Sequence, residues 1–289
     1  MCKVAVLLAA YNGMEWIEDQ VNSILSQKSV SVSLFISVDL SSDGTDVWAR
    51  ELAEKLNNVY LLPYGERFGG AGANFYRLIR DVNFHGFDYI SFSDQDDIWL
   101  DNKLERACSL LSAKICDVYS SDVLAFWSDG RQQLIKKSYP QKKFDHFFEA
   151  AGPGCTYVFN EKSAEALQGF IRDTNDLTKR VALHDWLAYA FCRKHGFKWH
   201  IDDQPLMLYR QHDSNQVGIN DGFQAYKKRL RLIKNHWYRG QVKSILELVD
   251  PYLSKHLDSY FFRCANASLF RRRTRDNVVL FIVLLFGIY

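Results

Sequence analysis

The chain has 289 residues, of which 15% are aromatic and only five are proline. This composition excludes a disordered protein, and the length is sufficient for one large domain or for a domain with an appendage. The net charge of +2 hides an asymmetry, because residues 223–289 carry thirteen Lys and Arg against four Asp and Glu, whereas residues 1–222 have a balance of −7. The split predicts an acidic part that does chemistry and a basic part that meets an anionic partner.

Residues 1–115 alternate between strand and helix patterns. Strands are expected at 3–9, 32–38, 58–62 and 88–93, and helices at 15–27, 44–56, 72–82 and 101–113. Right-handed crossovers between such units give an α/β fold, with a mostly parallel sheet covered by helices on both faces. The pattern then becomes mixed, with strands at 117–127, 155–159, 197–201 and 206–210 and helices at 161–171 and 184–195. Beyond Gly222 the chain is helical and basic, so we expect two parts, at 1–222 and 223–289.

The six cysteines form no C-x-x-C pair and no metal-ligand spacing. We therefore expect reduced thiols in a cytosolic setting. The apolar N-terminal stretch is too short for a signal peptide and runs directly into Tyr11-Asn12-Gly13.

Polar residues follow three of the expected strands: Tyr11-Asn12-Gly13, Asp39, and the acidic stretch Asp94-Gln95-Asp96-Asp97. In open parallel sheets, ligands bind at the carboxyl ends of the strands. Three carboxylates crowded at a strand end repel one another unless a cation is present, and oxygen ligands suit Mg²⁺ or Mn²⁺ together with substrate phosphates. The alternative is an acidic turn that caps the helix starting near Asp101. Neither a P-loop nor a dinucleotide-binding glycine motif follows the first strand.

These motifs, together with His184-Asp185-Trp186, resemble the metal-dependent, inverting glycosyltransferases of family 2, which have the GT-A fold. The resemblance spans roughly residues 3–213. A narrower set, which includes Gly154-Cys155-Thr156 and Tyr209-Arg210-Gln211-His212, resembles bacterial rhamnosyltransferases that use dTDP-L-rhamnose to build cell-wall polysaccharides and O-antigens. One departure is Leu40, which stands where the family usually has Gly in Asp-Asp-Gly-Ser.

The resemblance implies roles for single residues. Asp39 would accept from N3–H of uracil or thymine, although Asp at this place also suits a helix cap, and Tyr11 would stack on the base or belong to the core. Asp96 would hold the metal, and Asp94 the ribose or a metal-bound water. Further donor contacts are expected from Ala10, Asn12, Gln95, Arg67 and Asn74.

Asp185 is the candidate catalytic base, because transfer to a sugar hydroxyl requires a group that takes its proton. The alternative is a favourable charge in the first turn of a helix. His212 could join Asp96 on the metal and Arg210 could bind a phosphate, or this segment could be structural.

The C-terminal stretch Val278–Tyr289 is apolar but shorter than the ~20 residues that a membrane span needs. With Arg271-Arg272-Arg273-Thr274-Arg275 before it, it predicts a peripheral anchor on an anionic membrane, at the cytoplasmic face. The alternative is a helix packed on the core or in a homodimer. Nucleic acid is not expected as a partner, because no recognised binding module is present.

The sequence thus predicts a glycosyltransferase that moves a sugar, expected to be L-rhamnose, from a nucleoside-diphosphate donor to a hydroxyl of a lipid-linked saccharide. A UDP-sugar donor remains open. The alternatives from other classes are a sugar-1-phosphate nucleotidyltransferase and a non-catalytic nucleotide-sugar-binding protein.

Overall fold

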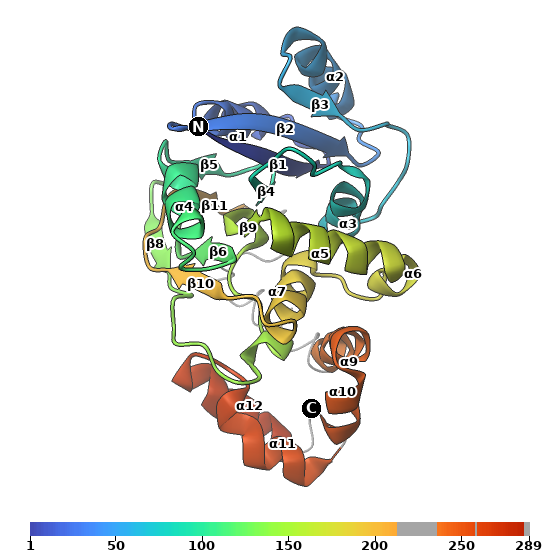
Figure 1. Cartoon of the computed structure of the whole chain (residues 1–289), viewed down its shortest axis with the longest axis vertical. Coiled ribbons are helices and arrows are strands. Elements are labelled where there is room, and N and C mark those ends of the chain that lie inside the picture. Colours follow the sequence, from blue (N-terminus) through green and yellow to red (C-terminus); the bar gives the residue numbers. More distant parts are fainter. Residues whose placement is uncertain (213–235, 258, 286–289) are drawn as a thin grey trace.

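The computed structural model describes residues 1–212, 236–257 and 259–285, in which a central sheet is covered by helices and followed by a helical C-terminal part (Figure 1). The main sheet has seven strands in the order β10-β6-β9-β4-β1-β2-β3. These strands are β1 (Cys2–Ala10), β2 (Val30–Val38), β3 (Val59–Leu61), β4 (Tyr89–Ser93), β6 (Val118–Ser121), β9 (Val158–Asn160) and β10 (Trp199–Asp202).

Strand β1 lies between β2 and β4 and pairs with both in parallel. Its side chains alternate between two cores. Ala5 and Leu7 face α3 (Ala71–Asp81), α5 (Glu161–Asp173) and α7 (His184–Lys194), whereas Val4 and Val6 face α1 (Ile17–Leu25) and α4 (Lys103–Ser112). Helix α2 (Thr45–Lys55) follows β2. The expected sheet with helices on both faces is therefore confirmed.

The middle of the chain differs from the expected pattern. The single strand expected at 117–127 divides at Asp122, whose carboxylate accepts hydrogen bonds from the backbone of Lys137 and Ser138. The second half becomes β7 (Val123–Phe126) in a separate sheet of order β5-β11-β7-β8, with β5 (Ile98–Trp99), β8 (Gln132–Ile135) and β11 (Met207–Arg210). The strand expected at 155–159 begins instead with a 3₁₀ turn at Gly154–Thr156, and β9 then runs antiparallel to both neighbours.

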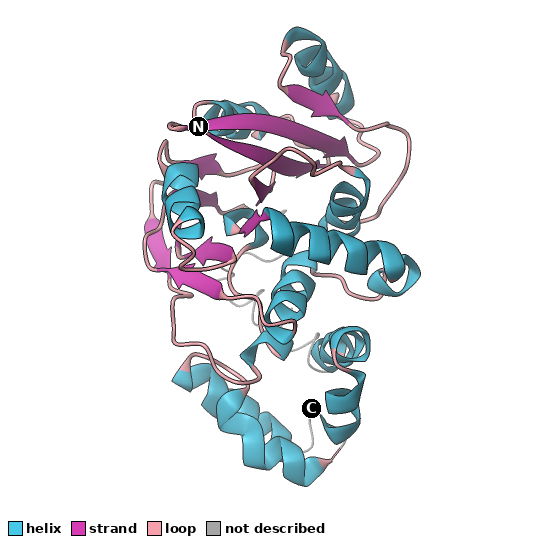
Figure 2. Cartoon of the chain, viewed as in Figure 1, coloured by secondary structure: helices cyan, strands magenta, loops and turns pink. Residues whose placement is uncertain are grey.

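The described part beyond residue 235 is helical, as expected, and Figure 2 shows no strand in it. It comprises α9 (Trp237–Val249), α10 (Pro251–Leu257), α11 (Tyr260–Asn266) and α12 (Thr274–Leu285). Val242, Leu246, Phe270 and Leu280 belong to the same hydrophobic core as α3, α5 and α7. The expected boundary at Gly222 lies outside the described residues.

Two of the arginines expected to face a membrane point into the protein instead. Arg272 is buried, and its guanidinium donates to the fully buried Asp145 at 3.1 Å and to the Ala150 carbonyl. Arg271 pairs with Glu149 at 3.8 Å. Only Arg273 and Arg275 of this group are exposed. Within the described ranges, none of the helices combines the length and the apolar character that a membrane crossing requires.

Candidate active site

The loops after β1 and β2 form one cross-linked unit at the carboxyl edge of the sheet. Asn12 Oδ1 accepts from the Ser42 amide at 2.9 Å, and the Asn12 amide donates to Ser41 Oγ at 3.0 Å. The Gly13 amide donates to Thr45 Oγ1 at 2.8 Å. Asn12 has φ 45°, a left-handed conformation that Asn tolerates better than most residues. Two of the three predicted polar strand ends are thus joined directly.

Gln95 connects the third strand end to the first. Its amide accepts from the Tyr11 N–H at 2.8 Å and donates to the Tyr11 carbonyl at 2.9 Å. A Cβ on residue 13 would lie 2.4 Å from Gln95 Oε1, so a larger residue there would displace the Gln95 amide from Tyr11. Gln95 therefore fixes the backbone beneath Tyr11, whose side chain is 48% exposed, rather than presenting a free amide to a donor.

Asp39 lies at the end of β2, almost fully buried, and anchors the loop before α3. Its Oδ1 accepts from the amides of Leu40 and Phe68, and its Oδ2 from Gly69 at 2.9 Å. Oδ2 has only this one hydrogen bond within the described residues and keeps a lone pair for a further donor. Arg67 is exposed on the same loop.

Asn74 does not offer the free polar group that the sequence suggested. It is 2% exposed, and both N–H groups of its amide are used, one on the Ala10 carbonyl and one on the Ser37 carbonyl. Its oxygen accepts from Ser37 Oγ. Asn74 and Ala10 therefore join the ends of β1 and β2, and neither amide donor remains for a sugar.

The acidic stretch after β4 lies where β1, β4 and β11 meet. Asp96 Oδ2 is 2.8 Å from His212 Nε2, and the His212 ring stacks on Trp16 with centroids 4.0 Å apart. Burial, followed by the charges of Asp96 and Asp185, raises the pKa of Asp94 to about 7. Carboxylate oxygens and one imidazole nitrogen are a suitable ligand set for Mn²⁺ or Mg²⁺, and the raised pKa indicates negative charge that a cation would relieve. The residues present therefore fit a divalent metal.

Arg210 is engaged by this acidic loop. Its Nε donates to the Asp96 carbonyl at 2.8 Å, its guanidinium reaches Asp19 at 3.4 Å, and its amide donates to Asp97 Oδ1 at 3.1 Å. Arg210 thus holds the acidic loop against β11, and its expected phosphate contact stays a prediction.

Asp185 lies in the first turn of α7, in the same site as the acidic stretch. Its Oδ1 accepts from the Trp186 amide at 2.8 Å, and burial raises its pKa to about 6. The neighbouring His184 stacks on Phe75 at 3.8 Å, and burial lowers its pKa to about 3. A Cβ on Gly154 would lie 2.6 Å from His184 Nε2 and 3.1 Å from Asp185 Cβ. A carboxylate close to ionisation at neutral pH is suited to general base catalysis.

One buried group behind the acidic stretch, Lys103, was missed. Asp97, Cys155 and Lys103 lie together, and burial lowers the pKa of Lys103 to about 7 while its ammonium lies 3.5 Å from the Trp99 ring centroid. Lys103 is four residues before Ala107 and eight before Leu111, on the apolar face of α4, and this spacing was the available signal.

A family model described as Glycosyl transferase family 2 matches residues 5–162, more than half of the chain. The chain belongs to this glycosyltransferase family. It is 42% identical to the dTDP-rhamnosyl transferase RfbG of Shigella flexneri, over 98% of this chain and 100% of the relative. It is 31% identical to the UDP-Glc:alpha-D-GlcNAc-diphosphoundecaprenol beta-1,3-glucosyltransferase WfgD of Escherichia coli, over 78% of this chain and 77% of that protein.

Among solved structures, the chain is similar to the mannosyltransferase PcManGT from Pyrobaculum calidifontis in complex with GDP-Man and Mn²⁺. The match covers 99% of this chain and 80% of the mannosyltransferase chain. The TM-score is 0.54 at 16% identity, so the likeness concerns the fold alone. The expected GT-A fold and glycosyltransferase class are confirmed, whereas the expected roles of single residues stay predictions.

Proposed function

We propose that the protein transfers L-rhamnose from dTDP-L-rhamnose to a saccharide hydroxyl, with inversion at the anomeric carbon. The observation that carries the chemistry is the partly buried carboxylate of Asp185, which lies close enough to Asp94 for its charge to raise that residue's pKa. The donor sugar is supported by the relative named as a dTDP-rhamnosyl transferase, which matches the chain along nearly its whole length.

In the proposed reaction, Asp185 takes the proton of the acceptor hydroxyl while that oxygen forms a bond to the anomeric carbon. The bond from this carbon to the diphosphate oxygen breaks on the opposite face, and dTDP leaves. Asp96 and His212, with Asp94, would hold Mg²⁺ or Mn²⁺, which when bound neutralises charge on the leaving diphosphate. The Mn²⁺ in the mannosyltransferase complex supports the use of a divalent metal.

Recognition of the base is assigned to the joined loops after β1 and β2. The remaining lone pair of Asp39 would accept from N3–H, and the exposed ring of Tyr11 would stack on the pyrimidine. Because uracil and thymine share N3–H, a UDP-sugar remains the second candidate donor.

The proposed acceptor is a lipid-linked saccharide at the cytoplasmic face of the membrane, where the protein would bind peripherally. Support comes from the printed name of the E. coli relative, whose acceptor carries a diphosphoundecaprenol group. The exposed apolar residues of α12, such as Val278, Val279 and Ile282, are compatible with this location.

The test is to incubate the protein with Mn²⁺ and either dTDP-L-rhamnose, UDP-glucose or GDP-mannose, and to measure nucleoside diphosphate release by slow hydrolysis. We expect dTDP-L-rhamnose to be hydrolysed fastest and EDTA to stop the reaction. Preference for the GDP-sugar would refute both the donor and the role of Asp39.

A further inference from the structure

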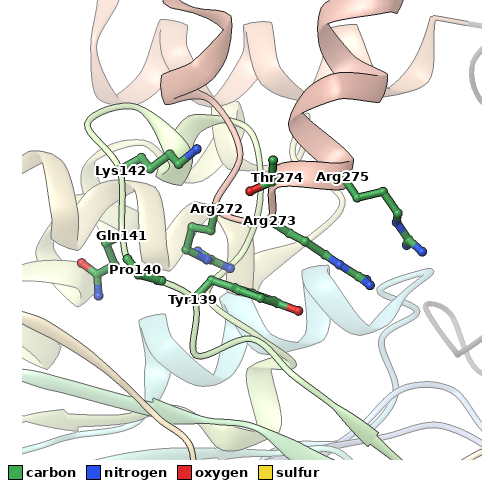
Figure 3. Close-up of a pocket in the computed structure, with 8 residues that line it drawn as sticks. All are labelled: Tyr139, Pro140, Gln141, Lys142, Arg272, Arg273, Thr274 and Arg275. Atoms are coloured by element: carbon green, nitrogen blue, oxygen red, sulfur yellow. The ribbon is translucent and has the colours of Figure 1, made fainter.

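A basic groove lies between residues 139–142, in the loop before the 3₁₀ turn at Asp145–Phe147, and the start of α12, away from the acidic stretch. It measures about 510 Å³, within the ~300–1,000 Å³ range of small-molecule sites. Figure 3 shows Arg273 and Arg275 extending from one wall and Tyr139 from the other. The full lining is Tyr139, Pro140, Gln141, Lys142, Arg272, Arg273, Thr274 and Arg275.

The charge in the groove is mostly uncompensated. Arg272 is neutralised by the buried Asp145, but no carboxylate within the described residues forms an ion pair with Arg273. Among the residues that the structure describes, Arg275 pairs only with its neighbour Asp276, at 3.3 Å. Lys142 donates to the Ser268 carbonyl, which carries no full charge. Three cations thus face one carboxylate, and this suits an anion with more than one negative charge.

An exposed apolar surface continues directly from the groove. Arg275, Val278, Val279 and Ile282 follow one another at spacings of three, one and three residues, which places them on one face of α12. Val278, Val279 and Ile282 are 46–57% exposed, whereas Leu280 and Leu284, on the opposite face, are buried in the core. A ligand that is anionic at one end and apolar at the other matches both parts of this surface.

The groove is also connected to the proposed base. Lys137 precedes the lining loop by two residues, and its ammonium lies within electrostatic reach of Glu149, Arg272, Arg271 and Asp185. An acceptor whose hydroxyl is at Asp185 would therefore extend its other end along Lys137 towards Arg273 and Arg275.

We propose that this groove binds the diphosphate of an isoprenoid-diphosphate-linked acceptor, with the first part of the isoprenoid chain on the exposed face of α12. The inference rests on the proposed function, and it adds a second anion site, distinct from the one for the donor diphosphate. The two sites differ in chemistry, because the groove offers cationic side chains, whereas the donor site offers carboxylates that need a metal.

The test measures farnesyl diphosphate binding to the full chain by calorimetry in EDTA, so that no metal holds a diphosphate at the donor site. We expect the double variant Arg273→Glu/Arg275→Glu to weaken binding at least tenfold, and Ile282→Ser to weaken binding of farnesyl diphosphate but not of inorganic diphosphate. The matched control is Arg50→Glu/Lys55→Glu, which makes the same charge change on α2, at the other end of the molecule in Figure 1. It should bind like the wild type.

Three outcomes would overturn the proposal. These are equal weakening in both double variants, binding of anionic vesicles but not of farnesyl diphosphate, and a wild-type dimer by sedimentation that the Ile282→Ser variant converts to a monomer. Donor hydrolysis with Mn²⁺ is measured on the same samples. Absence of donor hydrolysis by the wild type would refute the proposed function. Hydrolysis at the wild-type rate by the Arg273→Glu/Arg275→Glu variant would show that only the groove has been changed.

Discussion

Replacing Asp185 by Asn should separate a catalytic base from a helix-capping residue, because the two roles predict opposite changes in stability. Asn has nearly the same shape, and its oxygen can still accept from the Trp186 amide, so the hydrogen bond at 2.8 Å is retained. What disappears is the negative charge and the ability to take a proton.

The change in stability follows from the pKa. Burial raises the pKa of Asp185 from 3.8 to about 6, so at pH 7.5 the group is ionised in both states but its charge is less well stabilised in the folded protein than in the unfolded chain. A pKa difference of about two units between the folded and unfolded states lowers the unfolding free energy by about 3 kcal/mol. Because the folded pKa is raised, this penalty is complete above pH ~6 and disappears as the pH falls towards ~4. The uncharged Asn avoids it, and Asp185→Asn should stabilise the fold by up to about 3 kcal/mol at pH 7.5.

The change in rate should be in the opposite direction. Loss of a general base lowers turnover by roughly 10²–10⁴-fold, while donor binding persists because the acidic stretch and Asp39 are unchanged. In the wild type, the rate should fall about tenfold per pH unit below pH ~6, as the base becomes protonated, and this dependence should be absent from the residual rate of the variant.

The assay follows labelled rhamnose from dTDP-L-rhamnose into the lipid fraction of cell membranes at pH 5–8, with urea unfolding of the same samples in EDTA. A variant that unfolds at lower urea while retaining its transfer rate would refute the reasoning, because a helix cap and not a base would then have been removed.

Four further outcomes are expected. Asp96→Asn should abolish transfer. The Mn²⁺ affinity of the wild type should rise with pH up to about 7, because the metal must displace the proton of Asp94. A pH-independent Mn²⁺ affinity, measured by calorimetry, would contradict this role of Asp94. Titration with dTDP, UDP, GDP and CMP should show preference for dTDP and UDP, and Asp39→Ala should remove that preference. Arg272→Ala should lower the unfolding free energy by ~3 kcal/mol or more because it leaves Asp145 buried with less compensation, whereas the exposed Arg273→Ala should change it by less than ~0.5 kcal/mol. Gly154→Ala should slow transfer because its methyl group would press on His184 and Asp185, while Gly169→Ala, which has open space within α5, should be neutral or stabilising.

The sequence predicted the parts of the fold that depend on hydrophobic periodicity. The apolar runs of β1, β2 and β4 are buried, so these strands and their shared carboxyl edge could be inferred without coordinates. The antiparallel insertion of β9 could not, because a three-residue strand carries too little pattern and its partners are 39 to 71 residues away along the chain.

The same limit applies to single polar residues. Gln95 and Asn74 are near the site, as expected, but both amides hydrogen-bond the backbone of β1 or its loop. An amide suits a sugar hydroxyl and a peptide group equally well, so residue type alone does not decide between them. For Arg272, charge count predicted exposure, whereas the partner that draws it inward, Asp145, lies 127 residues earlier in the chain.

Helix α7 joins the two halves that the charge distribution separates. Asp185 is at its start, and Tyr189 and Arg193, one and two turns later, both contact Asp145, at 2.8 and 3.3 Å. Asp145 in turn holds Arg272, the residue that precedes the exposed arginines of the groove. The proposed base and the proposed acceptor site are therefore attached to one buried carboxylate, and a loss of Arg272 should affect transfer to the acceptor more than binding of the donor. A donor affinity that falls in parallel with the transfer rate would indicate a general loss of structure instead.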